Sequence, residues 1–251
     1  MFDYYRTPEE FMEQNGYAYD GRWFPRVTKI VGIKSKPALL YYYAQAPDFK
    51  TANEQTKKSA EEGTLVHEIA EKILIGEEPL IPSSIAPAIE ALQYFLREHD
   101  IAVVPAHIER RIINPVHRYA GTIDAMATIG GHFGVLDIKT SQAIYRDYNL
   151  QTSAYMDTLV REFPTLETRW ILRIDQNQTC KECHATMRTK GGRVKVKKNG
   201  RDACNMHDWN EPKGVVELVE LPGWKDDFKA FLGAKALWEW EHNDWLRRIG
   251  Y

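Results

Sequence analysis

The sequence predicts one elaborated domain of the mixed α/β (α+β) class, in which helices flank a mixed central sheet. Three observations lead to this prediction. The hydrophobic period changes from helical to alternating near residue 108 and returns to helical near residue 147. A Gly-Gly pair separates two of the alternating segments. The chain has 251 residues, 43% of them apolar and 27% charged, which is typical of a globular domain with a substantial buried core.

The first confidently expected helix runs from Ser59 to about Leu74. Ser59 and Glu62 have the spacing of a capping box, in which each side chain binds a free backbone N–H at the start of a helix. The apolar residues of this segment fall within an arc of about 140°, which predicts one buried face. They are Leu65, Val66, Ile69, Ala70, Ile73 and Leu74. A second helix is expected after Pro82, from about residue 84 to residue 98.

Strands are expected where the period is two. The three segments are 108–113, 119–128 and 133–139. Gly130 and Gly131 predict a tight hairpin turn between the last two, so we expect an antiparallel meander. The remaining expected elements are a helix over 147–162, strands over 169–174 and 215–220, and a Trp-rich helix over 224–245.

These elements divide the chain into three parts. Residues 1–58 are rich in aromatic side chains, with Tyr41 to Tyr43 in a short helix after Pro37, and we expect them to form a packed cap. Residues 59–175 and 214–251 form the core. Residues 176–213 interrupt the core as an insertion, which joins two strands that are expected to pair without it.

Charge is distributed unevenly along the chain. The net charge is −2, from 33 basic and 35 acidic residues, so the whole molecule has no bulk attraction for nucleic acid. The segment from Arg188 to Arg201 carries seven basic residues and no acid, which leaves 26 basic against 35 acidic residues, or −9, elsewhere. The basic residues are Arg188, Lys190, Arg193, Lys195, Lys197, Lys198 and Arg201.

No signal peptide or membrane-spanning run is recognisable. The first residues include acids and lack an apolar core, and no uncharged apolar run approaches about 20 residues. The three cysteines lie in one short stretch and cannot form a disulfide framework. We therefore expect a cytoplasmic protein in a reducing compartment with no membrane contact.

Two acids and a lysine are expected to share one surface. Side chains alternate along a strand, so Asp137 and Lys139 project from the same face, about 7 Å apart. Asp124 lies on the neighbouring strand of the hairpin and can approach Asp137. Two carboxylates this close repel each other unless a cation lies between them, and Mg²⁺ or Mn²⁺ prefers such oxygen ligands. A lone Asp-x-Lys is usually a solvated ion pair, so the prediction depends on the residues that accompany it.

Three residues on predicted helices accompany the two acids and the lysine. His67 lies at the border of the apolar face of its helix, where its side chain can reach a cleft. Gln151 and Tyr155 are four residues apart and share one helix face. They could contact the scissile phosphate or the metal-site carboxylates, although an aromatic residue at helical spacing commonly belongs to the core.

The segments GTLVHE, GTIDAM, LDIKTS and QTSAY, in this order and on these elements, resemble the PD-(D/E)XK nuclease superfamily. Within it they are similar to the RecB-like branch, which includes CRISPR-adaptation exonucleases and the mitochondrial genome maintenance exonuclease. The resemblance covers about residues 25–175 and the last strand. It implies a restriction-endonuclease-like core and metal ligands at His67, Asp124, Asp137 and the backbone carbonyl of Ile138.

The same resemblance assigns catalytic roles. Lys139 would position the attacking water and stabilise developing charge, and Gln151 with Tyr155 would form the helical Q-x-x-x-Y motif. Glu109 is a less certain addition. Metal-assisted phosphodiester cleavage needs such oxygens and a cation. The sequence has no Ser-His-Asp order, phosphate-binding GKS/T loop or dinucleotide-binding glycine turn, which disfavours acyl hydrolases, helicase motors and dinucleotide enzymes.

The insertion carries a second metal-ligand pattern. Cys180 and Cys183 form C-x-x-C, and Cys204 and His207 form C-x-x-H about twenty residues later, which predicts a zinc-ribbon-like hairpin with a structural zinc ion. His184 is a spare candidate ligand, and three unligated thiols are the bland alternative. The CRISPR-adaptation relatives hold an iron–sulfur cluster with one N-terminal and three C-terminal cysteines, and this chain departs from that arrangement.

The predicted function is a divalent-metal-dependent DNA nuclease, most simply an exonuclease on single-stranded ends, with Mg²⁺ or Mn²⁺ for catalysis and Zn²⁺ for structure. The basic run would bind phosphates, or it would be only a solvated face. Two alternatives remain open: a nucleic-acid-binding protein that uses an inactive nuclease fold with a zinc finger, and a structure-specific endonuclease. The compact size and the lack of a motor suggest a phage or mobile-element origin, by analogy only.

Overall fold

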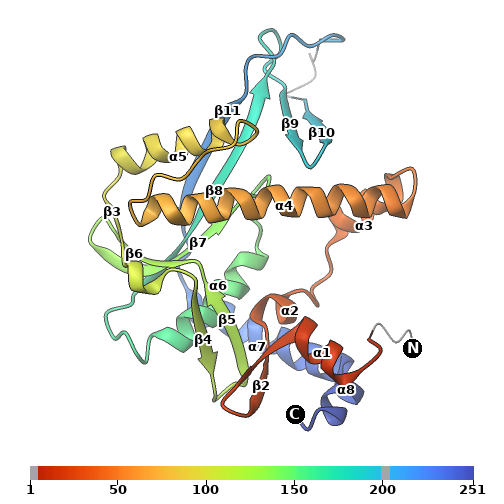
Figure 1. Cartoon of the computed structure of the whole chain (residues 1–251), viewed down its shortest axis with the longest axis vertical. Coiled ribbons are helices and arrows are strands. Elements are labelled where there is room, and N and C mark those ends of the chain that lie inside the picture. The colour runs from red at the N-terminus through yellow and green to blue at the C-terminus, as the bar shows by residue number, and fades with distance from the viewer. Residues whose placement is uncertain (1–4, 199–203) are drawn as a thin grey trace.

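The computed structural model of the chain describes residues 5–198 and 204–251. Its centre is a mixed seven-stranded sheet in the order β10-β9-β8-β7-β6-β3, with β11 paired to β8 (Figure 1). Strands β7 and β8 run parallel, and the other pairs are antiparallel. The strands are β3 (Ile101–Val103), β6 (Ala125–Ile129), β7 (His132–Lys139), β8 (Thr168–Thr179), β9 (Thr186–Lys190), β10 (Arg193–Lys197) and β11 (Lys213–Glu220). The predicted α/β class with a mixed sheet is confirmed.

Helices cover both faces of the sheet because its side chains alternate. Leu136 and Ile138 of β7 belong to the apolar cluster formed with α4 (Phe49–Leu74) and α5 (Ala86–Glu98). Val135 belongs to the opposite cluster, formed with α2 (Val27–Val31), α6 (Asp147–Leu159) and α7 (Trp224–Glu241). Asp137 and Lys139 therefore face α6, as their spacing predicts.

Helix α4 begins ten residues before the predicted start. Asp48 is its N-cap and accepts a hydrogen bond from the backbone N–H of Thr51 at 2.8 Å. Ser59 and Glu62 do not cap a helix, so this prediction is wrong. Both instead bind the insertion: the Ser59 hydroxyl donates to the carbonyl of Lys190, and Glu62 accepts from the N–H of Gly191. The boundary drawn between residues 58 and 59 lies inside this helix.

The segment 119–128 is not one strand. It divides into β5 (Tyr119–Ile123) and β6, and only Asp124 lies between them. Strand β5 pairs with β4 (Arg110–Asn114) in a separate two-stranded sheet, whereas β6 pairs with β7. The chain thus changes sheets at Asp124, and the predicted three-stranded meander is corrected to two hairpins in two sheets.

The other predicted elements are present with shifted ends. Gly130 and Gly131 form the β6–β7 turn, with φ of 57° and 85°, which favour glycine. The predicted strand 169–174 is longer, since β8 continues to Thr179. The last helix ends at Glu241 and is followed by α8 (Asn243–Arg248). In the described part of the chain, no helix is both long and apolar enough to cross a membrane.

The N-terminal segment packs only in part. The elements α1 (Pro8–Asn15), β1 (Gly16–Tyr19) and β2 (Arg22–Pro25) place Phe11 and Trp23 against Trp238 of α7, as a packed cap would. Helix α3 (Pro37–Gln45) forms after Pro37 as predicted, but it is largely exposed. Tyr41 is 66% exposed, so the apolar bulk of this helix does not belong to the core.

The insertion extends the central sheet. Strand β9 pairs with the end of β8 through Gln178 and Thr179, and with β10 along its whole length. The β9–β10 hairpin (Thr186–Lys197) lies beside the N-terminal half of α4 (Figure 1). The hairpin is therefore packed against the core.

Replacing the buried Arg169 with methionine should lower the free energy of unfolding by about 3 kcal/mol, because it leaves Asp227 without its partner. Arg169 joins β8 to α6 and α7: it donates to the carbonyls of Leu221 and Asn149 and pairs with Asp227. Chemical denaturation measures the loss. Lys229→Met is the control, since its ion pair with Asp226 is exposed to solvent and should contribute little to stability. Equal losses would contradict the prediction.

Candidate functional site

An open pocket of about 510 Å³ lies between α4 and the end of β7. Among the residues predicted for the catalytic site, His67, Ile138 and Lys139 line it. The less certain candidate Glu109 lines it as well. The remaining lining residues are Ser59, Ala60, Gly63, Thr64, Glu68, Glu71 and Thr140.

Asp124 and His67 meet at this pocket. The Nε2 atom of His67 lies 2.9 Å from Oδ2 of Asp124, and its Nδ1 atom lies 2.7 Å from Oε1 of Glu71. The same Oδ2 of Asp124 accepts a hydrogen bond of 2.6 Å from the backbone N–H of Ile138. The imidazole is therefore held between two carboxylates, and Asp124 is fixed to β7 although it lies between two sheets.

Glu109 approaches the same point. Oxygen and nitrogen donors of His67, Glu109 and Asp124 all lie within 4.8 Å of one another. The backbone N–H of Glu109 donates to the carbonyl of Asp124 at 3.0 Å, and Glu109 has a left-handed φ of 48°. A non-glycine residue in this conformation costs about 1 kcal/mol or more, and such strain clusters at functional sites.

Asp137 forms the second half of the site. It is fully buried, pairs with the ammonium of Lys139, and accepts a hydrogen bond of 3.1 Å from the Gln151 amide. The same amide donates to the hydroxyl of Tyr155 at 3.0 Å. The sequence left open whether Gln151 and Tyr155 contact the phosphate or the carboxylates. In the structure, Gln151 contacts the Asp137 carboxylate, and Tyr155 is buried behind Gln151.

The electrostatics show crowded carboxylates. Burial, with the hydrogen bond and charge of Glu71, raises the pKa of Glu109 to about 7. Burial raises the pKa of Asp137 to about 6, with Asp124 adding to the shift and Lys139 opposing it. Burial alone would lower the pKa of His67, but its bonds to Asp124 and Glu71 raise it to about 10. Glu109 and Asp137 thus keep their protons more readily than free acids do, because ionised carboxylates this close repel each other.

These donors fit a hard divalent cation. Oδ2 of Asp137 is buried and has no hydrogen-bond partner of good geometry, although the Lys139 ammonium is next to it. Carboxylate oxygens from separate elements, next to an open pocket, are the ligand type that Mg²⁺ and Mn²⁺ prefer. His67 would have to lose its proton to serve as a ligand. Among the described residues, the compact donor cluster contains Glu109 in place of the predicted Asp137.

Sequence reasoning missed two neighbours of the site. Glu71 lies four residues after His67 on α4, a spacing that signals contact on one helix face. Tyr148 lies on α6, with the Lys139 ammonium 5.2 Å from its ring centre. No local pattern indicates that contact, because the two residues come from different elements.

The second predicted metal site is assembled in the insertion. Cys180, Cys183, Cys204 and His207 have donor atoms within 4.8 Å of one another. The Cys204 sulfur lies 3.6 Å from that of Cys180, 3.4 Å from that of Cys183 and 3.2 Å from Nδ1 of His207. Ligand–ligand separations of up to about 3.8 Å are expected around a tetrahedral zinc ion with Zn–S bonds of about 2.3 Å. The donor set and its spacing fit zinc.

Backbone N–H groups lower the pKa of Cys180 and Cys183, whereas burial and these two thiols raise the pKa of Cys204 to about 12. The N–H of Cys183 is the main cause that lowers the pKa of Cys180 to about 6, which favours the thiolate that zinc requires. His184 is exposed, has a left-handed φ of 57° and is not part of the cluster. The three thiols and the His207 imidazole are thus gathered at one point of the insertion.

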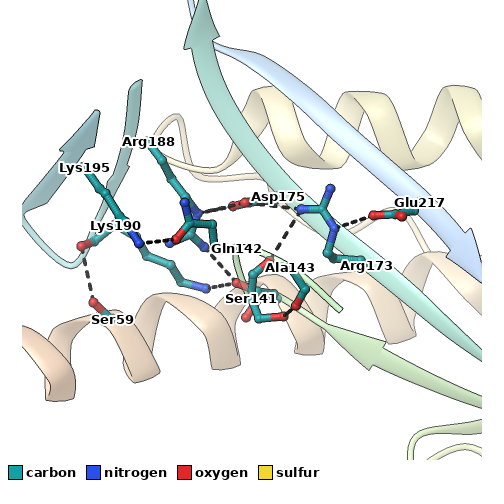
Figure 2. A network of polar contacts seen from close by, with 11 residues as sticks. Ser59, Ser141, Gln142, Ala143, Arg173, Asp175, Arg188, Lys190, Lys195 and Glu217 are labelled. Carbon is teal, nitrogen blue, oxygen red and sulfur yellow. Dashed lines mark hydrogen bonds and ion pairs between the residues drawn. The ribbon is translucent and has the colours of Figure 1, made fainter. Parts of the chain in front are cut away.

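The basic run divides into two groups. Arg188 and Lys190 point inward: Arg188 pairs with Asp175, and both donate to the carbonyl of Thr140 (Figure 2). The others with described positions, Arg193, Lys195, Lys197 and Lys198, lie at the surface or partly exposed. Arg201 lies outside the described residues.

Comparisons with known proteins add only a distant structural likeness. Neither protein-family models nor curated proteins match the chain. A solved structure titled "Crystal structure of SSO0001" is similar at 16% sequence identity and a TM-score of 0.32, covering 67% of this chain and 68% of that one. A likeness this weak carries no argument about function.

Proposed function

We propose that this protein is a divalent-metal-dependent deoxyribonuclease of the PD-(D/E)XK type, acting on single-stranded ends. One observation carries the proposal: His67, Asp124, Asp137 and Lys139, from a helix, a sheet-changing bend and a strand, converge beside an open pocket. The motif order in the sequence supports the same core. The Cys₃His cluster is proposed to hold a structural zinc ion.

Each residue has a role that its contacts support. Asp124, Asp137 and the Ile138 carbonyl, with His67 and Glu109 beside them, would hold Mg²⁺ or Mn²⁺, which supplies a hydroxide near neutral pH and neutralises phosphate charge. Gln151 orients the Asp137 carboxylate, and Glu71 orients the His67 ring. Lys139 holds a positive charge at the pocket wall, where it can stabilise the charge that develops on the phosphate.

The competing function is nucleic-acid binding without cleavage. The exposed cations of the hairpin favour it, because they can bind phosphates whether or not the carboxylates act. A cleavage assay on linear and circular, single- and double-stranded DNA labelled at each end separates the two. Cleavage of linear single strands that EDTA abolishes supports the nuclease, and circular substrates would be resistant if ends are required. Binding of DNA without cleavage under all metal conditions would overturn the proposed nuclease function.

Mg²⁺ and Mn²⁺ should support cleavage and Ca²⁺ should not. The donors beside the pocket are carboxylates and an imidazole, and Ca²⁺ at such a site accepts looser geometry and acidifies bound water less. Initial rates at matched ion concentrations measure the difference. Equal rates in Ca²⁺ would contradict a site that activates water.

A further inference from the structure

The β9–β10 hairpin is docked at one end of the carboxylate pocket. Its tip lies on α4, where Ser59 donates to the carbonyl of Lys190 at 3.3 Å and Glu62 accepts from the N–H of Gly191 at 3.1 Å. Gly191 has a φ of 59°, and a Cβ there would lie 2.3 Å from the Ser59 hydroxyl, so the approach requires glycine. Ser59 itself lines the pocket, which means that the hairpin borders it.

The hairpin is also joined to the loop that follows the catalytic strand. Lys190 and Arg188 donate to the carbonyl of Thr140, the residue after Lys139, at 2.5 and 3.0 Å. Lys195 donates to the side chain of Gln142 at 2.8 Å. Figure 2 shows Lys190, Lys195 and Ser59 around this loop. The cation of Lys195 thus lies close to the exit of β7.

On its other side the hairpin meets aromatic residues. The guanidinium of Arg193 lies 4.0 Å from the ring centre of Tyr42 on α3, and the Tyr42 hydroxyl donates to Gln55 of α4 at 2.8 Å. Next to Tyr42, the Tyr43 ring stacks on Phe49 with 5.4 Å between ring centres. Phe49 is 72% exposed and Tyr43 is half-buried, so the pair presents mainly the Phe49 ring to solvent.

Helix α4 connects the aromatic pair to the pocket. Phe49 and His67 are 18 residues apart, which is five full turns, so both project from the same face about 27 Å apart. Residues between them on that face are small or uncharged: Asn53, Thr56, Ala60 and Gly63. In the parts of the chain that the structure describes, neither Arg193 nor Lys195 forms an ion pair with a carboxylate.

We propose that this surface binds single-stranded DNA and leads it to the carboxylate pocket. We define it as the α4 track: Tyr43, Phe49, Arg193, Lys195 and the α4 face from Phe49 to His67. The proposal rests on the proposed nuclease function and names the surface that would bind its single-stranded substrate. Exposed aromatic rings stack on unpaired bases, and arginine and lysine bind the phosphates between them. A duplex hides its base faces, so the aromatic pair selects single strands.

The test measures binding without cleavage. The affinity for a labelled oligo(dT) of about 12 nucleotides is determined by fluorescence anisotropy in the Asp137→Asn background, without chelator and without added Mg²⁺ or Mn²⁺, at several salt concentrations. Phe49→Ala and Tyr43→Ala should each weaken binding about tenfold. Trp240→Ala is the matched control, because Trp240 is an aromatic residue of α7 with the same 72% exposure as Phe49, and its affinity should not change.

Further variants separate the contributions of stacking and of charge from that of packing. Phe49→Leu keeps an apolar side chain and should still lose affinity, whereas Phe49→Trp should keep it. Arg193→Ala with Lys195→Ala should flatten the salt dependence by about 0.7 per lost phosphate contact, and the exposed Lys229→Ala should not.

Wild-type affinity in Phe49→Ala and Tyr43→Ala, or equal losses in Trp240→Ala, would overturn the track. Equal loss of duplex and single-strand binding would also overturn it, since stacking requires unpaired bases. Because binding is measured without the Asp137 carboxylate and without added Mg²⁺ or Mn²⁺, these outcomes do not depend on cleavage. A protein that binds through the track but never cleaves would refute only the proposed nuclease.

Discussion

Asp137→Asn should lower the rate of phosphodiester cleavage at least about a hundredfold, or about 2.7 kcal/mol, while the protein stays folded. Asparagine has the shape of aspartate, so the hydrogen bond from Gln151 can be kept, but the charge that binds the cation is lost. Asp124→Asn and Lys139→Ala are expected to have similar effects, since they remove a ligand candidate and the positive charge at the pocket wall. Initial cleavage rates in Mn²⁺, with circular dichroism to verify folding, measure this.

The control for this series is Asp157→Asn. Asp157 is a half-buried aspartate on α6 whose carboxylate accepts hydrogen bonds from Asn114 at 2.9 Å and from the Tyr119 hydroxyl at 3.3 Å, neither of which belongs to the site. Its replacement should leave cleavage near the wild-type rate. If the three site variants cleave as fast as Asp157→Asn, the site assignment fails.

Purified protein should contain about one zinc ion per chain, and Cys204→Ser should lose it, because its sulfur lies within 3.6 Å of three other donors. Without the metal, residues 176–213 should exchange amide hydrogens faster, since few apolar side chains hold this segment together. From the sequence, the carboxylate site should stay intact, because the insertion joins two core strands that are expected to pair without it. The structure leads to a different expectation: cleavage should fall as well, because Arg188 and Lys190 hold the carbonyl of Thr140, next to Lys139.

His184→Ala is the matched control for zinc loss. His184 lies between the cysteine pairs in sequence but outside the donor cluster, so this variant should keep the zinc ion and the slow exchange. Elemental analysis of both variants gives the result directly. Iron in place of zinc, or no metal in the wild-type protein, would refute the zinc site.

Local signals account for what could be predicted. The Gly130–Gly131 turn, the alternation that puts Asp137 and Lys139 on one face, and the cysteine and histidine spacing each depend on neighbours in sequence. The structure agrees with all three. Such features are determined by backbone geometry over a few residues, which is why one sequence is enough to find them.

Contacts between distant segments account for what was missed. Ser59 and Glu62 have the pattern of a capping box, yet Asp48 caps the helix and both residues bind a hairpin about 130 residues later. Glu109 reaches the site because its backbone bonds to Asp124, at the point where the chain changes sheets. Neither relation leaves a periodic signal in the sequence.

The sequence by itself determined the mixed α/β class, the order of the carboxylate, lysine and helical motifs, and the four donors of the cysteine and histidine cluster. Tertiary structure alone decided that the basic hairpin lies on α4 at the end of the pocket, and that Phe49 and His67 lie on one uninterrupted helix. The physical reason is the distance along the chain over which each interaction acts. Turns, alternation and ligand spacing follow from local geometry, whereas docking depends on side chains that only the complete fold brings together.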